Sequence, residues 1–240
     1  MDSTNTRCIV LRTIKYGDNS IIADLLTREW GRLSVAVKVG AGGNGRRRRL
    51  MFQPLNILEI TCKRRQGKQL SLVTEERMAE AYTSLPFDGI KMSIAFFAAE
   101  FLLHATRDIQ ADEPLFDFIE NSLLWLDTAD HGVANFHLML MLHLSKFIGF
   151  YPDTESYAVG YGFDLREGRF CSHAPIHRDY LQPQDAEKIL QLMRMSAHNM
   201  HLFRMTRAER NRITDTILHF YRLHIPAFPE LRSLDILREL

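Results

Sequence analysis

A run of four arginines follows a glycine-rich stretch early in the chain: Arg46, Arg47, Arg48 and Arg49. Guanidinium groups make forked hydrogen bonds to phosphate, and every phosphate that they neutralise releases counterions. The glycines between Gly40 and Gly45 give the backbone the freedom to bring these side chains to a ligand. We therefore expect residues 40–49, together with Lys38, to form a basic loop that binds a nucleic-acid backbone and is disordered without DNA.

A second basic cluster lies in the next predicted hairpin: Lys63, Arg64, Arg65 and Lys68. Two basic segments on one small domain predict an electrostatic groove that follows a single strand. The alternative is ordinary solvated surface, although clusters of one sign repel themselves until a counter-charge arrives. A nucleotide-hydrolysing P-loop is excluded, because Gly45 is followed by arginine and not by the lysine that such a loop requires.

Three aromatic residues accompany these basic segments in the sequence: Tyr16, Trp30 and Phe52. Aromatic rings that stack on bases are typical of proteins that bind single strands. The same rings also commonly fill the core of a small barrel, and the sequence leaves both interpretations open.

A third group of arginines lies at the start of a helix predicted late in the chain: Arg204, Arg207, Arg210 and Arg212. The interpretations are a solvated helix face and a docking site for an acidic partner peptide or for the DNA backbone.

The chain has no motif typical of an enzyme. It contains neither G-x-S-x-G nor H-E-x-x-H. Cys171 lies close to His173 and His177, but a structural zinc site needs four ligands, so we expect no metal or other cofactor. An enzyme that uses Cys171 and a histidine is the weakest alternative, because it requires a perturbed, partly exposed thiol.

Charge is divided unevenly along the 240 residues, whose net charge is +1. Residues 1–80 hold 15 lysines and arginines against 8 acidic residues, and residues 81–240 hold 15 against 21. Such asymmetry favours nucleic acid as a partner of the basic part. The three widely separated cysteines suit a reducing cytoplasm, and we expect neither a secretory signal nor a membrane-spanning segment.

Residues 7–79 show the pattern of a small β-barrel. Leu33, Val35 and Val37 alternate with more polar residues, as in a half-buried strand. Further short apolar runs, separated by turn residues, bring the expected number of strands to five, which fits an OB-fold and also an SH3-like barrel. We predict an α+β protein with a barrel domain over residues 1–82.

Residues 83–240 show helical spacing instead. Apolar residues recur every three or four positions, most clearly from Val133 to Ile148, and Thr206 and Glu209 form a capping-box sequence. Residues 150–182 interrupt this pattern. We therefore predict an all-α domain with an irregular insert there, and a last short helix over residues 230–239.

Several segments resemble the RecO family of bacterial DNA-repair proteins. They occur in the family's order and spacing over nearly the whole chain: Cys8–Ser20, Leu25–Leu33, Val37–Gly40, Phe52–Leu55, Leu144–Pro152 and Phe163–Phe170. The resemblance implies an N-terminal OB-fold and a helical domain. It implies a non-catalytic recombination mediator that binds single- and double-stranded DNA and anneals complementary strands.

The resemblance also implies partners. Family members act with RecR to load RecA onto DNA coated by single-stranded-DNA-binding protein (SSB), and some bind the acidic SSB tail through the helical domain. Many carry a four-cysteine zinc site in the insert, where this chain retains only Cys171, so packing of Tyr157, Tyr161, Phe163 and Phe170 is expected in its place. An RNA-binding barrel protein and a protein-only adaptor whose basic loop docks an acidic partner remain alternatives.

Overall fold

We describe the protein from a computed structural model, over residues 3–40, 42–63 and 70–240. The chain divides into two compact units, Met1–Thr128 and Ala129–Leu240. The first unit contains the strands of a barrel and the first long helices. The second unit contains the remaining long helices and a small sheet. The domain boundary expected near residue 82 stays a prediction.

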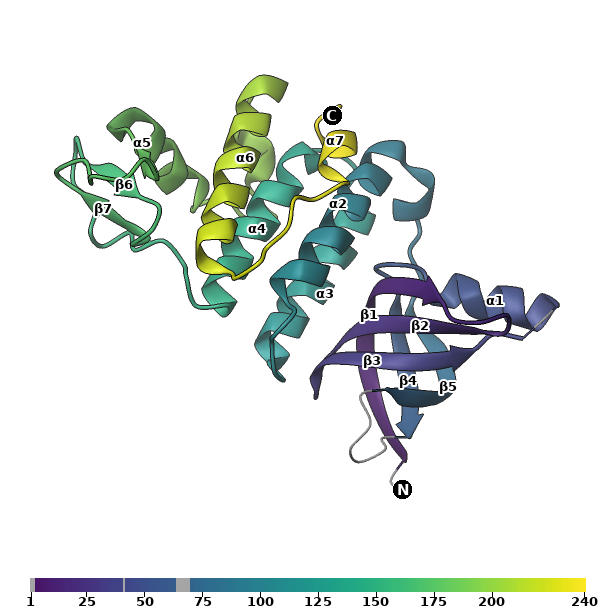
Figure 1. The fold of residues 1–240 in the computed structure, drawn as a ribbon. Coiled ribbons are helices and arrows are strands. Elements are labelled where there is room, and N and C mark those ends of the chain that lie inside the picture. Colours follow the sequence, from purple (N-terminus) through teal and green to yellow (C-terminus); the bar gives the residue numbers. More distant parts are fainter. Residues whose placement is uncertain (1–2, 41, 64–69) are drawn as a thin grey trace. The chain divides into compact units, whose positions relative to one another are not determined.

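The first unit is built on a closed five-stranded barrel with the strand order β1-β2-β3-β5-β4 (Figure 1). Neighbouring strands are antiparallel except β3 and β5, which pair in parallel. The strands are β1 (Ser3–Lys15), β2 (Ser20–Thr27), β3 (Gly31–Lys38), β4 (Ile57–Lys63) and β5 (Ser71–Glu80). Because β5 closes the barrel between β3 and β4, the topology is OB-like and not SH3-like.

The predicted alternation places every second residue of β3 in the barrel. Val35 and Val37 are fully buried there, whereas Lys38 points to solvent. They join a core to which all five strands contribute, including Val10, Leu25 and Ile60. This confirms the period-2 interpretation of the sequence.

The basic segment after β3 is a helix and not the expected loop. Helix α1 covers Gly43–Met51, and its first backbone hydrogen bond runs from Arg46 N to Gly42 O at 3.0 Å. Arg48 and Arg49 lie in its last turn, where positive charge is favourable beside the helix dipole. The expectation that the arginines are disordered is therefore wrong for this structure.

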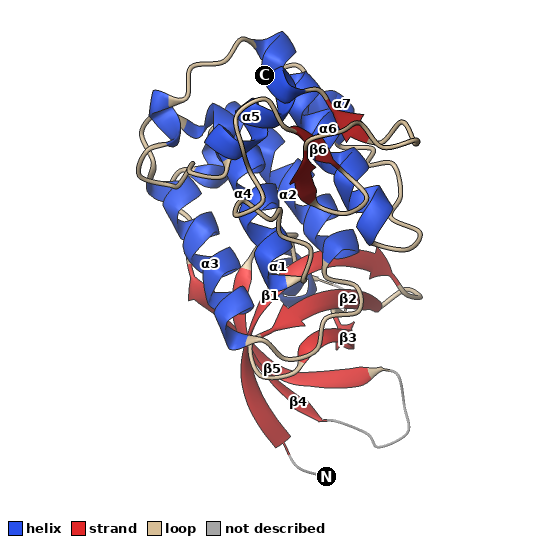
Figure 2. Ribbon diagram, turned by 90° about the vertical axis from the view of Figure 1, so that its left-hand side faces the viewer, coloured by secondary structure: helices blue, strands red, loops and turns tan. Residues whose placement is uncertain are grey.

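The rest of the first unit is helical: η1 (Leu85–Phe87), α2 (Gly89–Ala105) and α3 (Glu113–Thr128). Asp88 caps α2 by accepting hydrogen bonds from the backbone of Ile90 and Lys91. Asp112 caps α3 by accepting a hydrogen bond from Leu115 N, and Pro114 lies in the first turn, where its missing N–H costs no helical hydrogen bond. Figure 2 distinguishes the red strands of the barrel from these blue helices.

The second unit contains η2 (Val133–Asn135), α4 (Phe136–Phe147), α5 (Pro183–Leu192), η3 (Met200–Leu202), α6 (Arg207–His224) and α7 (Leu234–Leu237). The capping box predicted from Thr206 and Glu209 is present at the start of α6. The last helix is shorter than predicted, at four residues. Among the described residues, each helix is too short or too polar to span a bilayer.

The insert has more regular structure than the sequence predicted. It forms a three-stranded sheet in the order β7-β6-β8, from β6 (Gly162–Asp164), β7 (Arg169–Cys171) and β8 (Tyr180–Leu181). Phe163 and Phe170 are buried, and Tyr157 and Tyr161 pack against the cluster that they form. The expected aromatic packing is confirmed. The strands were missed because two or three residues carry too little periodicity.

Candidate nucleic-acid interface

Helix α1 displays most of the arginine run to solvent. Arg46, Arg47 and Arg49 are exposed, and none of them is paired with an acidic side chain among the described residues. Arg46 and Arg49 are three positions apart and so share one face of the helix. Uncompensated guanidinium groups on a regular helix form a surface that attracts phosphate.

Arg48 is oriented differently from its neighbours. One of its terminal nitrogens donates to Lys38 O at 2.7 Å, and the other donates to the Glu76 carboxylate on β5. Its side chain is 23% exposed and that of Glu76 is 13% exposed. Arg48 is therefore directed toward the barrel.

The turn between β1 and β2 lies beside α1. Asn19 O accepts hydrogen bonds from Val39 N at 2.9 Å and Gly40 N at 3.3 Å, so the turn is bonded to the chain just after β3. An Arg49 terminal nitrogen lies 3.5 Å from Asp18 O in the same turn. Tyr16 is 58% exposed there.

The turn adds a residue that sequence reasoning missed. Lys15 is exposed next to Tyr16, and its position immediately before a turn that carries an aromatic residue was the available signal.

The other two aromatic candidates occupy different environments. Phe52 is fully buried in the barrel core, so the prediction that its ring stacks on a base is not supported, because the ring has no exposed face. Trp30 is partly buried and packs against the same core. Tyr16 is therefore the candidate with the most accessible ring.

The second basic cluster is described only at its first residue. Lys63 is exposed at the end of β4, while Arg64, Arg65 and Lys68 lie outside the described residues. Lys63 pairs with Leu72, which pairs in turn with Ala36, two residues before Lys38. The barrel register thus places Lys63 two strands from β3.

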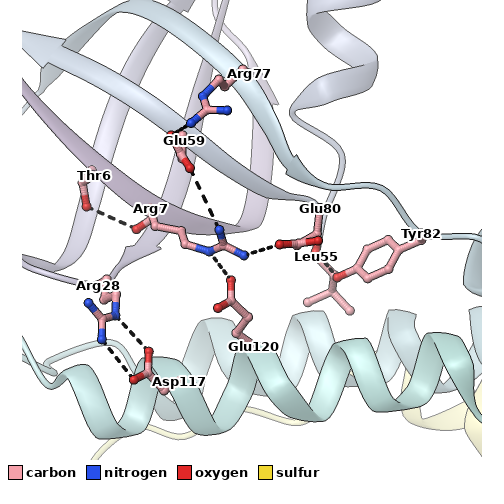
Figure 3. Close-up of polar contacts among 10 residues, drawn as sticks. All are labelled: Thr6, Arg7, Arg28, Leu55, Glu59, Arg77, Glu80, Tyr82, Asp117 and Glu120. Atoms are coloured by element: carbon pink, nitrogen blue, oxygen red, sulfur yellow. Dashed lines mark hydrogen bonds and ion pairs between the residues drawn. The ribbon is translucent and has the colours of Figure 1, made fainter.

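Other arginines of residues 1–80, the basic third of the chain, form ion pairs or hydrogen bonds within the first unit. Arg7 on β1 contacts Glu80 at 2.8 Å and Glu120 on α3 at 2.6 Å (Figure 3). Arg28 binds Asp117 on α3 at 2.9 Å, and this hydrogen bond lowers the pKa of the Asp117 carboxyl.

Arg12 and Arg32 are engaged as well. Arg12 binds Asp24 at 2.7 Å. Arg32 donates to Leu103 O and Thr106 Oγ1, and burial lowers the pKa of its guanidinium. The uncompensated positive charge among the described residues of the barrel therefore concentrates on α1 and the adjoining chain.

Comparison with known proteins identifies the chain's family. The family models described as Recombination protein O N terminal and Recombination protein O C terminal match residues 1–82 and 86–235. The chain belongs to the RecO family. A relative from Phocaeicola vulgatus, named DNA repair protein RecO, is 43% identical and aligns over 97% of this chain and 96% of its own length.

More distant relatives carry the same name. The Porphyromonas gingivalis protein is 36% identical over 98% of each chain, and the Flavobacterium psychrophilum protein is 30% identical over 98% of this chain and 97% of its own length. The barrel and helices described above therefore belong to a member of a DNA-repair protein family, and the RecO resemblance is confirmed.

The insert of this RecO chain does not offer the residues of a four-thiolate zinc site. Cys171 is its single cysteine, and Cys8 and Cys62 are buried in the barrel. In the described ranges, no three His, Cys, Asp or Glu residues are grouped as metal ligands. Phe163 and Phe170 pack edge to face, with ring centroids 4.9 Å apart, in the core of the insert.

The late arginines of this RecO chain separate into two pairs. Arg204 and Arg212 are exposed and line a pocket of about 340 Å³ beside α6. Arg207 donates to Arg238 O, and Arg210 is 9% exposed and donates to Leu240 O at 3.1 Å. The prediction of four docking arginines therefore needs correction, because burial and these hydrogen bonds engage Arg210 within the fold.

Proposed function

We propose that this chain binds single- and double-stranded DNA through the α1 surface, defined as Lys38, Arg46, Arg47, Arg49, Lys15 and Tyr16. On this proposal it anneals complementary strands and, with RecR, helps to load RecA onto SSB-coated DNA. The observation that carries the proposal is that three exposed arginines of one barrel-mounted helix have no acidic partner among the described residues.

Annealing follows from the same electrostatics. Two complementary strands repel each other through their phosphates, and a shared basic surface lowers that repulsion by releasing counterions. No covalent bond is made or broken in this process, so we propose a mediator and not an enzyme. We propose that it works in the cytoplasm. The aromatic packing in the insert supports a protein that works without zinc.

The test is fluorescence anisotropy with a labelled single-stranded oligonucleotide across a salt series. The triple variant Arg46→Ala, Arg47→Ala, Arg49→Ala is expected to bind more weakly. Its log–log salt slope should be shallower by about two, because each phosphate contact on a single strand contributes roughly 0.7. The matched control removes three exposed arginines of the second unit, Arg178, Arg194 and Arg222, and should retain the wild-type slope.

The outcomes separate the rival functions. Tighter binding to a matched RNA than to DNA would favour an RNA-binding barrel. If the chain does not bind DNA even at low salt, but still pulls down RecR or SSB after nuclease treatment, a protein adaptor would be favoured.

We further propose that the pocket beside α6 receives the acidic C-terminal tail of SSB. Arg204, Arg212 and Lys188 supply positive charge, while the pocket also has an apolar lining: Leu192, Leu202, Phe203, Met205 and Ile213. Such a combination suits an acidic peptide that carries apolar side chains.

A labelled synthetic copy of the tail tests the second proposal. The variant Arg204→Glu, Arg212→Glu should lose the peptide, whereas Arg222→Glu, an exposed position on α6 outside the pocket, should retain it. Equal binding by both variants would place the tail elsewhere.

A further inference from the structure

Helix α1 is mounted closely on the barrel. Gly45 packs so near the preceding chain that a Cβ there would overlap the carbonyl oxygens of Val39 and Gly40. At the other end, the Asn56 amide donates to Leu50 O and Met51 O, each at 3.0 Å. The direction in which the helix presents its side chains is therefore set by specific contacts with its surroundings.

Between these two ends of α1, Arg48 bonds the helix to strands β3 and β5. Its donor pair spans the Lys38 carbonyl at the end of β3 and the Glu76 carboxylate on β5. Its Nε is buried too. A phosphate at this guanidinium would have to compete with the Lys38 carbonyl and the mostly buried Glu76 carboxylate for the two terminal nitrogens, which makes Arg48 a poor phosphate ligand.

We infer that Arg48 and Glu76 form a positioning pair for DNA binding, which holds α1 so that Arg46, Arg47 and Arg49 meet phosphates together. This inference rests on the proposed function. Arg48, which its residue type alone would place among the phosphate ligands, acts through the helix that carries its neighbours. Glu76, an acidic residue, is required for binding a polyanion.

The requirement for Glu76 gives a prediction whose sign opposes simple electrostatics. Removing a negative charge beside a DNA site ordinarily strengthens binding, because it reduces repulsion of phosphate. If Glu76 positions α1, its removal weakens binding. Glu75 is the matched control, because it is adjacent on β5, is exposed, and has no ion pair among the described residues.

The experiment compares wild type, Glu76→Ala, Glu76→Gln and Glu75→Ala in the anisotropy salt series. We expect Glu76→Ala to bind about fivefold more weakly, the scale of losing one ion pair. Glu75→Ala should bind as wild type does or slightly more tightly. Glu76→Gln should fall between wild type and Glu76→Ala, because its amide oxygen still accepts from Arg48, whereas a purely electrostatic effect would make Gln and Ala equivalent.

Hydrogen exchange measures directly how firmly α1 is held against the barrel. In Glu76→Ala, the α1 amides should exchange faster while the amides of β1 and β2 keep their protection. If Glu76→Ala loses protection throughout the barrel, the comparison rests on Glu76→Gln, for which affinity equal to or above that of Glu75→Ala overturns the inference.

The two proposals fail in different ways. If wild type does not bind DNA, or if the Arg46, Arg47 and Arg49 triple variant binds normally, the α1 surface is not the site. If those results hold but Glu76→Ala binds as tightly as Glu75→Ala, only the positioning role is wrong.

Discussion

At the scale of single residues, Asp127 connects the end of the barrel to α3. Its carboxylate accepts hydrogen bonds from the backbone nitrogens of Thr83, Ser84 and Leu85, at 2.7–3.1 Å, and from Thr83 Oγ1. Burial by itself would raise the pKa of this carboxyl, but these hydrogen bonds outweigh it and lower the pKa. One side chain therefore accepts the backbone N–H hydrogen bonds of the segment between the last barrel strand and α2.

We predict that Asp127→Asn destabilises the protein by about 2–3 kcal/mol at pH 7, because the amide presents hydrogens to buried backbone donors. Urea unfolding measures the loss, with the exposed Asp130→Asn as control. A lowered folded-state pKa means that the contribution is full above about pH 4 and is lost as the pH falls through the folded pKa. The difference between wild type and Asp127→Asn should therefore narrow in acid, and a constant difference would contradict this account.

The residue scale also shows what the sequence could not reveal about the site. Four adjacent arginines are identical in type, so their sequence predicts phosphate contact for all of them. Contacts with the Lys38 carbonyl and with Glu76, 28 residues away, distinguish Arg48 from its neighbours. Phe52 is a similar case, because stacking and core packing require the same ring, and burial alone separates them.

At the scale of elements, the barrel strands were predictable and α1 was not. Strand β3 alternates apolar and polar residues, and the other barrel strands are short apolar runs bounded by turn residues. Helix α1 lacks an apolar stripe and includes Gly43 and Gly45, which disfavour helix. Its stability comes from tertiary contacts such as the close approach of Gly45 to the chain after β3, and a local pattern does not contain these.

We predict that Gly45→Ala weakens DNA binding severalfold although it changes no charge, because the new Cβ would force α1 away from Val39 O and Gly40 O. Gly43→Ala is the matched control in the same helix, since a Cβ there meets nothing within 4 Å. Anisotropy with a single-stranded oligonucleotide compares the two. Equal affinities would show that the position of α1 against the barrel does not affect DNA binding.

At the scale of the whole molecule, the basic third predicted from composition is not uniformly basic in the fold. Arg7, Arg12 and Arg28 are paired with acidic residues, and Arg32 is bonded to the end of α2. Composition therefore indicated the part of the chain for which we propose DNA binding. It could not indicate which charges are available there, because ion pairing depends on contacts made across the fold.

The distribution of the three cysteines over the whole chain leads to the last prediction. Cys8 and Cys62 are fully buried on β1 and β4, and burial raises the pKa of the Cys62 thiol to about 11, which disfavours the thiolate that binds metal. Cys171 alone remains in the insert, whose core is aromatic. A strong chelator should therefore leave the thermal unfolding midpoint unchanged, since a structural zinc ion would contribute folding free energy that the chelator removes. Purified protein with stoichiometric zinc by elemental analysis, or a midpoint that falls on chelation, would contradict the prediction, and Cys171→Ser should behave as wild type in both measurements.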